Sequence, residues 1–116
     1  MEKKNFEIDY DKERDIMSIH SRGAKSKFSF DISLPKGDFV IDFGYDGKIV
    51  GIEFFNASAY FPGLEKVNIS KLNVALAVRY SNDWAEIGLE ISSPELEKPF
   101  SRMIISPYNK EFVVKN

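Results

Sequence analysis

The chain has 116 residues, a common size for one domain and long enough to bury a hydrophobic core. Hydrophobic residues make up 43% of it and aromatic residues 14%, which is too much apolar material for an intrinsically disordered chain. The 16 basic and 18 acidic residues interleave and leave a formal net charge of -2. Because no basic cluster forms, we expect a single domain over residues 1–116 that binds neither nucleic acid nor a membrane surface.

Residue types and apolar segments that the sequence lacks exclude further kinds of chemistry and location. The chain has no cysteine, which excludes disulfides, thiolate catalysis and cysteine-ligated zinc. No apolar run approaches the roughly twenty residues of a membrane span, and the N-terminus lacks the apolar region of a secretory signal. We therefore expect a cytoplasmic protein.

Apolar and polar residues alternate through the first half of the chain, which is typical of strands with one buried face. The pattern predicts strands over residues 4–10, 15–20, 28–33, 39–45 and 48–55. Asp11-Lys12-Glu13 forms a polar turn between the first two strands. Asp46-Gly47 is typical of a type I′ turn and predicts a hairpin between the last two.

The second half continues the pattern after one short helical segment. Good helix formers follow Asn56, but Pro62-Gly63 limits them, so we expect one short helix near residues 56–68. Further strands are predicted over residues 71–80, 84–91 and 100–105, and Glu111–Val114 could add one more. We predict a mainly β fold, an antiparallel meander of about eight strands that forms a sandwich or a partly open barrel. An α+β fold is the alternative.

Two stretches of the first half carry a family resemblance. These are Asp9-Tyr10-Asp11-Lys12-Glu13-Arg14-Asp15-Ile16-Met17-Ser18-Ile19, and Val40-Ile41-Asp42 with the segment Asp46-Gly47-Lys48-Ile49-Val50-Gly51-Ile52-Glu53. Together they resemble the small proteins called domain of unknown function 2283, over about Phe6 to Ser58. The resemblance implies a compact β-rich fold and no established activity. It also implies, by analogy only, an antitoxin-like role as the partner of a second small protein.

The acidic residues of the first half are candidates for a functional site. Counted from Asp9, the spacing does not fit a calcium-binding loop, because Arg14 stands where the loop requires glycine. Asp42 lies within a predicted strand, and alternation turns it outward, opposite Lys48 or Glu53. A carboxylate site would use Asp9, Asp15 and Asp42, with His20 as the one available imidazole. The sequence identifies no catalytic residue, metal ligand or cofactor site beyond these candidates.

The aromatic residues suggest a different role. Phe54 and Phe55 are adjacent and must point to opposite sides of their strand, so one of them is a candidate for an interface. Trp84 is predicted on the face of its strand opposite Ile87. Gly51 interrupts a strand, which indicates a bulge or the close approach of a bulky side chain.

Two functions from different classes follow. The first is a non-enzymatic interaction domain that forms a homodimer or binds a second small protein, with Phe54, Phe55 and Trp84 as candidate contacts. The second is a small metal- or ligand-binding domain or enzyme that uses the three carboxylates. The sequence favours the interaction domain.

Overall fold

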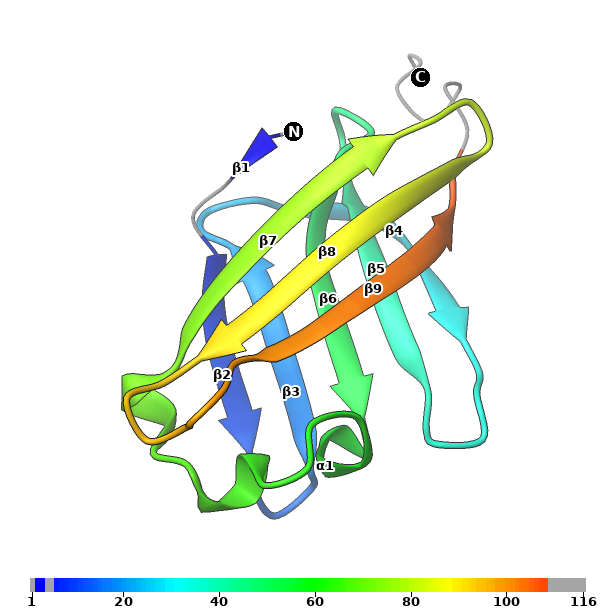
Figure 1. The fold of residues 1–116 in the computed structure, drawn as a ribbon. Coiled ribbons are helices and arrows are strands. Elements are labelled where there is room, and N and C mark those ends of the chain that lie inside the picture. Colours follow the sequence, from blue (N-terminus) through cyan, green and yellow to red (C-terminus); the bar gives the residue numbers. More distant parts are fainter. Residues whose placement is uncertain (1, 4–5, 109–116) are drawn as a thin grey trace.

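Two antiparallel β-sheets make up most of the molecule. The computed structural model describes residues 2–3 and 6–108, and the predicted strand over Glu111–Val114 lies outside these residues. In Figure 1 the strands of the front sheet run diagonally across those of the rear sheet. The described strands form an open two-sheet sandwich and do not close into a barrel.

The rear sheet has five strands. Their order across the sheet is β2 (Phe6–Asp11), β3 (Ile16–Ser21), β6 (Ile49–Phe55), β5 (Phe39–Gly44) and β4 (Ser26–Ile32). All neighbours are antiparallel. The front sheet has the order β1 (Glu2–Lys3), β7 (Asn73–Tyr80), β8 (Trp84–Ser92) and β9 (Phe100–Pro107).

One short helical region joins the two sheets, as the sequence predicts. It contains helix α1 (Ala57–Tyr60) and two 3-10 turns, Leu64–Lys66 and Ile69–Lys71. The mainly β prediction is thus confirmed, with each predicted strand from residue 4 to residue 105 present within a few residues.

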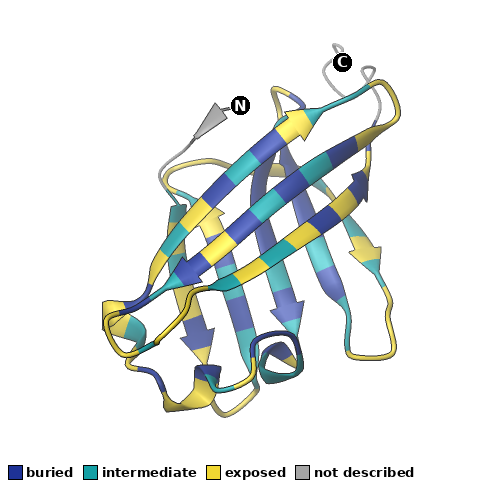
Figure 2. Ribbon diagram, viewed as in Figure 1, coloured by how far each residue is buried: buried dark blue, intermediate teal, exposed yellow. Residues whose placement is uncertain are grey.

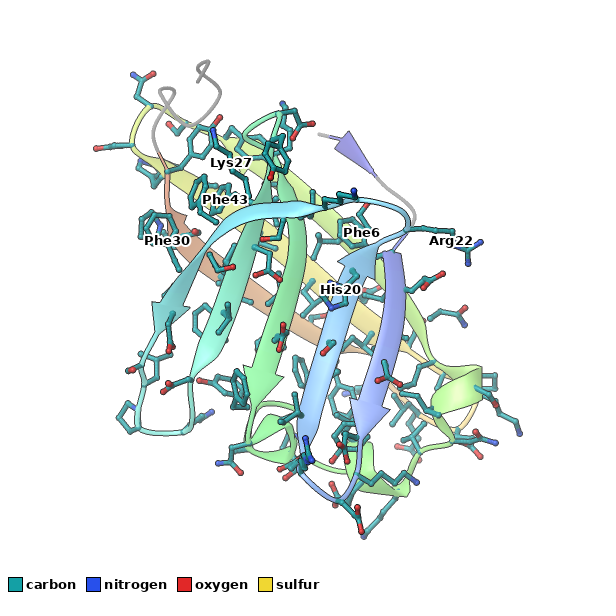
Figure 3. The ribbon with its side chains drawn as sticks, turned by 180° about the vertical axis from the view of Figure 1, so that it is seen from behind. Phe6, His20, Arg22, Lys27, Phe30 and Phe43 are labelled. Atoms are coloured by element: carbon teal, nitrogen blue, oxygen red, sulfur yellow. The ribbon has the colours of Figure 1, made fainter. Side chains whose placement is uncertain are left out.

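The strand order differs from a simple meander at one point. β3 pairs with β6, and the chain between β3 and β4 crosses the ends of β6 and β5, as Figure 3 shows from behind. β3 to β6 therefore form a Greek key. The crossing passes close to β5, since a Cβ at Gly44 would lie 3.4 Å from the Lys25 carbonyl oxygen.

The hairpin between β5 and β6 has a different turn from the predicted one. A type I′ turn needs positive φ at both central residues, but only Gly47 has it, at 77°. The Gly47 amide donates to the Gly44 carbonyl (3.0 Å) and the Gly44 amide to the Lys48 carbonyl (2.8 Å). This is a three-residue hairpin loop with glycine at the left-handed position.

The core lies between the inner faces of the two sheets. Figure 2 shows more buried residues alternating with intermediate or exposed ones along β7, β8 and β9, as a sheet with one covered face requires. The largest fully buried aromatic side chains are Phe43, Phe54 and Phe61. The rings of Phe54 and Phe61 meet edge to face with centroids 5.1 Å apart, so the helical region is anchored to the rear sheet.

Candidate functional site

Asp15 holds the turn between β2 and β3 against helix α1. Its carboxylate accepts hydrogen bonds from the Tyr10 hydroxyl (2.5 Å), the Ser58 hydroxyl (2.7 Å) and the Ser58 amide (3.0 Å). Burial favours a raised pKa for Asp15, but these hydrogen bonds outweigh it and lower the pKa below the ordinary value. The pKa of Tyr10 is raised by burial, by the hydrogen bond to Asp15 and by the negative charge of the Asp15 carboxylate. These contacts give Asp15 a structural position.

Asp9 and Asp42 lie on the outward face of the five-stranded sheet, apart from Asp15. Asp9 is exposed on the edge strand β2, opposite Ser18. Asp42 lies on β5 and faces outward, as alternation predicts, but its cross-strand neighbours are Gly51 and Ser29 instead of Lys48 or Glu53. A two-residue turn at Asp46-Gly47 would also place Asp42 opposite Gly51, and the bulge just beyond Asp42 restores this register after the three-residue loop. The predicted carboxylates therefore do not converge on one cavity in the described structure.

Asp42 instead shares a small notch with His20. The two side chains flank Gly51 from the neighbouring strands, in a row that runs Glu7, His20, Gly51, Asp42 and Ser29 across the sheet. A Cβ at Gly51 would lie 2.9 Å from His20 Nδ1 and 3.1 Å from Asp42 Oδ2, so these atoms are within about 6 Å of each other. Figure 3 views this face and shows His20 where β3 and β6 meet. The prediction that Gly51 marks a bulge or a close approach is confirmed by the approach of these two side chains, and the β5–β6 bulge lies next to it.

Asp42 is unusually buried for a carboxylate on an outward face. It is only 8% exposed, and its Oδ1 accepts a 2.5 Å hydrogen bond from the Ser29 hydroxyl. Within the described residues, Oδ2 has no hydrogen-bond partner and Asp42 forms no ion pair. One oxygen of a nearly buried carboxylate is thus directed into the notch.

The surroundings of the notch are acidic. The other carboxylates on this face, by their alternation with buried residues, are Glu7, Asp9, Asp31, Asp38 and Glu53. Arg22 Nε pairs with Glu7 Oε1 at 2.6 Å on the edge of the sheet. Desolvation and the neighbouring Asp38 carboxylate raise the pKa of Asp31, which shows that two acidic groups stand close together.

The outward face of the four-stranded sheet has the opposite character. Small residues on β7 and β8, namely Ala75, Ala77 and Gly88, lie beside the exposed side chains of Met103 and Ile105 on β9. Met103 and the three small residues border an open groove of about 450 Å³ along the sheet. We call this surface the β7–β9 face.

A second groove of about 310 Å³ opens beside β9, between the edges of the two sheets. It is lined mainly by apolar side chains, including Ile32 and Phe39 of the rear sheet and Leu34 of the loop between β4 and β5. Met103 and Ile105 border this groove as well, so the apolar surface continues from the β7–β9 face around the β9 edge. A contiguous exposed apolar surface is typical of a protein-interaction site.

The three aromatic candidates occupy three different environments. Phe54 is buried in the core with 1% exposure, so it is unavailable as a surface contact. Phe55 points to the opposite side and is partly exposed on the acidic outward face. Trp84 is 37% exposed and starts β8, on the side opposite the buried Ile87, as predicted. The sequence missed Met103, Ile105 and Leu34, although Met103 and Ile105 alternate with buried Ile104.

The described part of the chain lacks two kinds of feature. No group of three or more histidine or acidic side chains is placed to hold a metal ion. No helix in this part is long and apolar enough to cross a membrane.

Comparisons with known proteins agree with the resemblance in the first half. Uncharacterized protein MJ0789 of Methanocaldococcus jannaschii is 42% identical over 64 residues, which are 55% of this chain and 51% of that protein. The chain thus matches about half the length of this relative. No solved structure matches the chain significantly. The family model described as protein of unknown function (DUF2283) matches residues 7–58. This match covers most of β2 to β6, and the family is the one that the first half of the sequence resembles.

Proposed function

We propose that this protein is a non-enzymatic interaction domain that forms a homodimer through its β7–β9 face. The observation that carries the proposal is the exposure of Met103 (67%) and Ile105 (54%) beside a groove of small residues. Exposed apolar side chains gain free energy when a partner removes them from water, by about 25 cal/mol per Å².

The shape of the face favours a second copy as the partner. Met103 and Ile105 form a ridge on β9, and Ala75, Ala77 and Gly88 form a trough on the adjacent strands. A twofold axis through the face brings the ridge of each copy onto the trough of the other, which is the self-complementarity that a symmetric dimer needs.

Charge supports the same arrangement. Arg79 and Glu86 lie on this face, with Arg79 Nη2 2.5 Å from Glu86 Oε2, and Glu90 lies one row beyond Gly88. Opposite charges on one face can pair across a twofold axis as well as within a subunit, so Arg79 can also pair with a carboxylate of the second copy.

Native mass spectrometry of the purified protein tests the proposal. We expect a species of twice 13.3 kDa for the wild type. The double variant Met103→Lys/Ile105→Glu places opposite charges in the apolar ridge without changing the net charge, and we expect it to be monomeric. The matched control is Tyr45→Ser, which removes an exposed aromatic (68%) from the β5–β6 turn and should leave the dimer intact.

A monomeric wild-type protein at tens of micromolar contradicts the proposal. So does a dimer that survives the double variant. A complex with a second small protein that forms only when the β7–β9 face is intact would replace the homodimer with a heteromeric use of the same surface.

A further inference from the structure

We propose that the outward face of the five-stranded sheet binds a basic segment of a partner protein, with one lysine or arginine side chain held in the notch over Gly51. This surface lies on the other side of the sandwich from the β7–β9 face, so the inference stands whether or not the protein dimerises.

The burial and hydrogen bonding of the Asp42 carboxylate favour a bound cation. A carboxylate removed from water needs charge or hydrogen-bond compensation, and Asp42 is 8% exposed. Ser29 supplies a hydrogen bond to Oδ1, whereas Oδ2 faces the notch without a partner among the described residues. No fully buried polar side-chain atom among the described residues lacks a hydrogen-bond partner, so Oδ2 keeps some contact with solvent and a cation can reach it.

The size of the notch suits one cationic nitrogen. A cationic nitrogen forms hydrogen bonds of about 2.8–3.0 Å, so one ammonium group between two acceptors spans up to about 6 Å. Asp42 Oδ2 and His20 Nδ1 lie within that span, on either side of the space that Gly51 leaves empty. Any larger residue at position 51 would occupy this space.

The surface around the notch combines acidic groups with partly exposed apolar side chains. Carboxylates of Asp31, Asp38 and Glu53 surround outward-facing Val40 and Phe55, both partly exposed. Acidic groups around an apolar centre complement a segment that combines basic and apolar side chains. The same charges repel the phosphates of a nucleic acid.

A divalent cation is the competing occupant. The described residues offer no third histidine or acidic ligand in metal-binding geometry at this position. A single lysine or arginine needs only the two acceptors that are present. The geometry thus favours a side-chain cation over a metal ion.

The test is an NMR titration of the ¹⁵N-labelled protein with the capped peptide Lys-Val-Lys-Val-Lys. We expect saturable shifts centred on the Gly51, His20 and Asp42 amides, and none with the matched peptide Glu-Val-Glu-Val-Glu. Asp42→Asn keeps the shape of the side chain and removes its charge, and should weaken binding on the order of tenfold. Glu90→Gln removes a carboxylate from the opposite sheet and should leave the affinity unchanged.

A second variant fills the notch. The Cβ of Gly51→Ala would meet His20 Nδ1 and Asp42 Oδ2, so we expect a loss of binding similar to that of Asp42→Asn. The amide spectrum of each variant reports whether it is folded, and Asp42→Asn carries the test if Gly51→Ala is not.

Three outcomes overturn the inference. The first is that peptide-induced shifts map to another surface, and the second is that Asp42→Asn and Glu90→Gln weaken binding equally. The third is that Zn²⁺ or Mg²⁺ alone saturates the same amides at micromolar concentration. The last result would reassign the notch to a metal ion.

Discussion

At the scale of single residues, Asp15 stabilises the fold by accepting hydrogen bonds at a turn with unusual backbone geometry. Its φ is 57°, and its carboxylate takes the Ser58 amide of helix α1, whose own N-cap residue Asn56 makes no side-chain cap. Asn tolerates left-handed φ nearly as well as Asp, so Asp15→Asn removes the charge without adding strain. We expect it to lower the free energy of unfolding at pH 7 by about 2–3 kcal/mol, measured by urea denaturation.

The same variant makes a prediction about pH. The folded pKa of Asp15 is below 3.8, so its contribution is complete above the unfolded pKa and is lost as pH falls through the folded value. The difference between wild type and Asp15→Asn should be constant from about pH 7 to pH 5 and shrink below about pH 4. A difference of equal size at about pH 2.5 would show that the stabilisation is independent of the charge.

At the scale of elements, β8 contains a glycine that the strand itself does not require. Gly88 does not have the left-handed φ that favours glycine, and a Cβ there would meet only the Ala77 carbonyl oxygen, at 3.8 Å. Because glycine weakens strands and valine favours them, we expect Gly88→Val to raise the free energy of unfolding of the monomer by about 1 kcal/mol. The added side chain also fills the trough of the β7–β9 face, so the variant should dimerise less.

Two measurements on this variant separate the effect on stability from the effect on dimerisation. Urea denaturation at low protein concentration reports the monomer, and sedimentation velocity at higher concentration reports the dimer. A variant that is more stable and still fully dimeric would place the interface elsewhere.

Elements were largely predictable because their signals are local. Alternation over residues 48–55 or 84–91 fixes which side chains face inward, and polar or glycine-containing turns separate the strands. The neighbour of β3 was not predictable, since it depends on the crossing of the chain over β6 and β5. No local pattern specifies that choice.

In the candidate sites too, features that depend on one strand were predictable, and features that depend on the topology were not. Sequence identified Asp42 as outward and Gly51 as a place of close approach, because each depends on its own strand. It could not bring His20 to Gly51, since their pairing results from the Greek key. It also missed Met103 and Ile105, because an apolar run over residues 103–105 does not reveal which of its members are exposed.

At the scale of the whole molecule, a net charge of -2 conceals two unlike surfaces. Acidic groups gather on the outward face of the five-stranded sheet, and exposed apolar groups on and beside the four-stranded sheet. Attraction between exposed charges is screened by salt, whereas burial of apolar surface is not. The two proposed interactions should therefore respond differently to ionic strength.

We expect a rise from about 0.05 M to about 0.5 M NaCl to weaken the binding of the Lys-Val-Lys-Val-Lys peptide on the order of tenfold. The dimer should be unchanged or tighter under the same conditions, as measured by sedimentation equilibrium. Met103→Lys/Ile105→Glu should abolish the dimer and leave the peptide affinity and its salt dependence as in the wild type. If the dimer instead dissociates in high salt, charge holds the two copies together, and the acidic face becomes the better candidate for self-association.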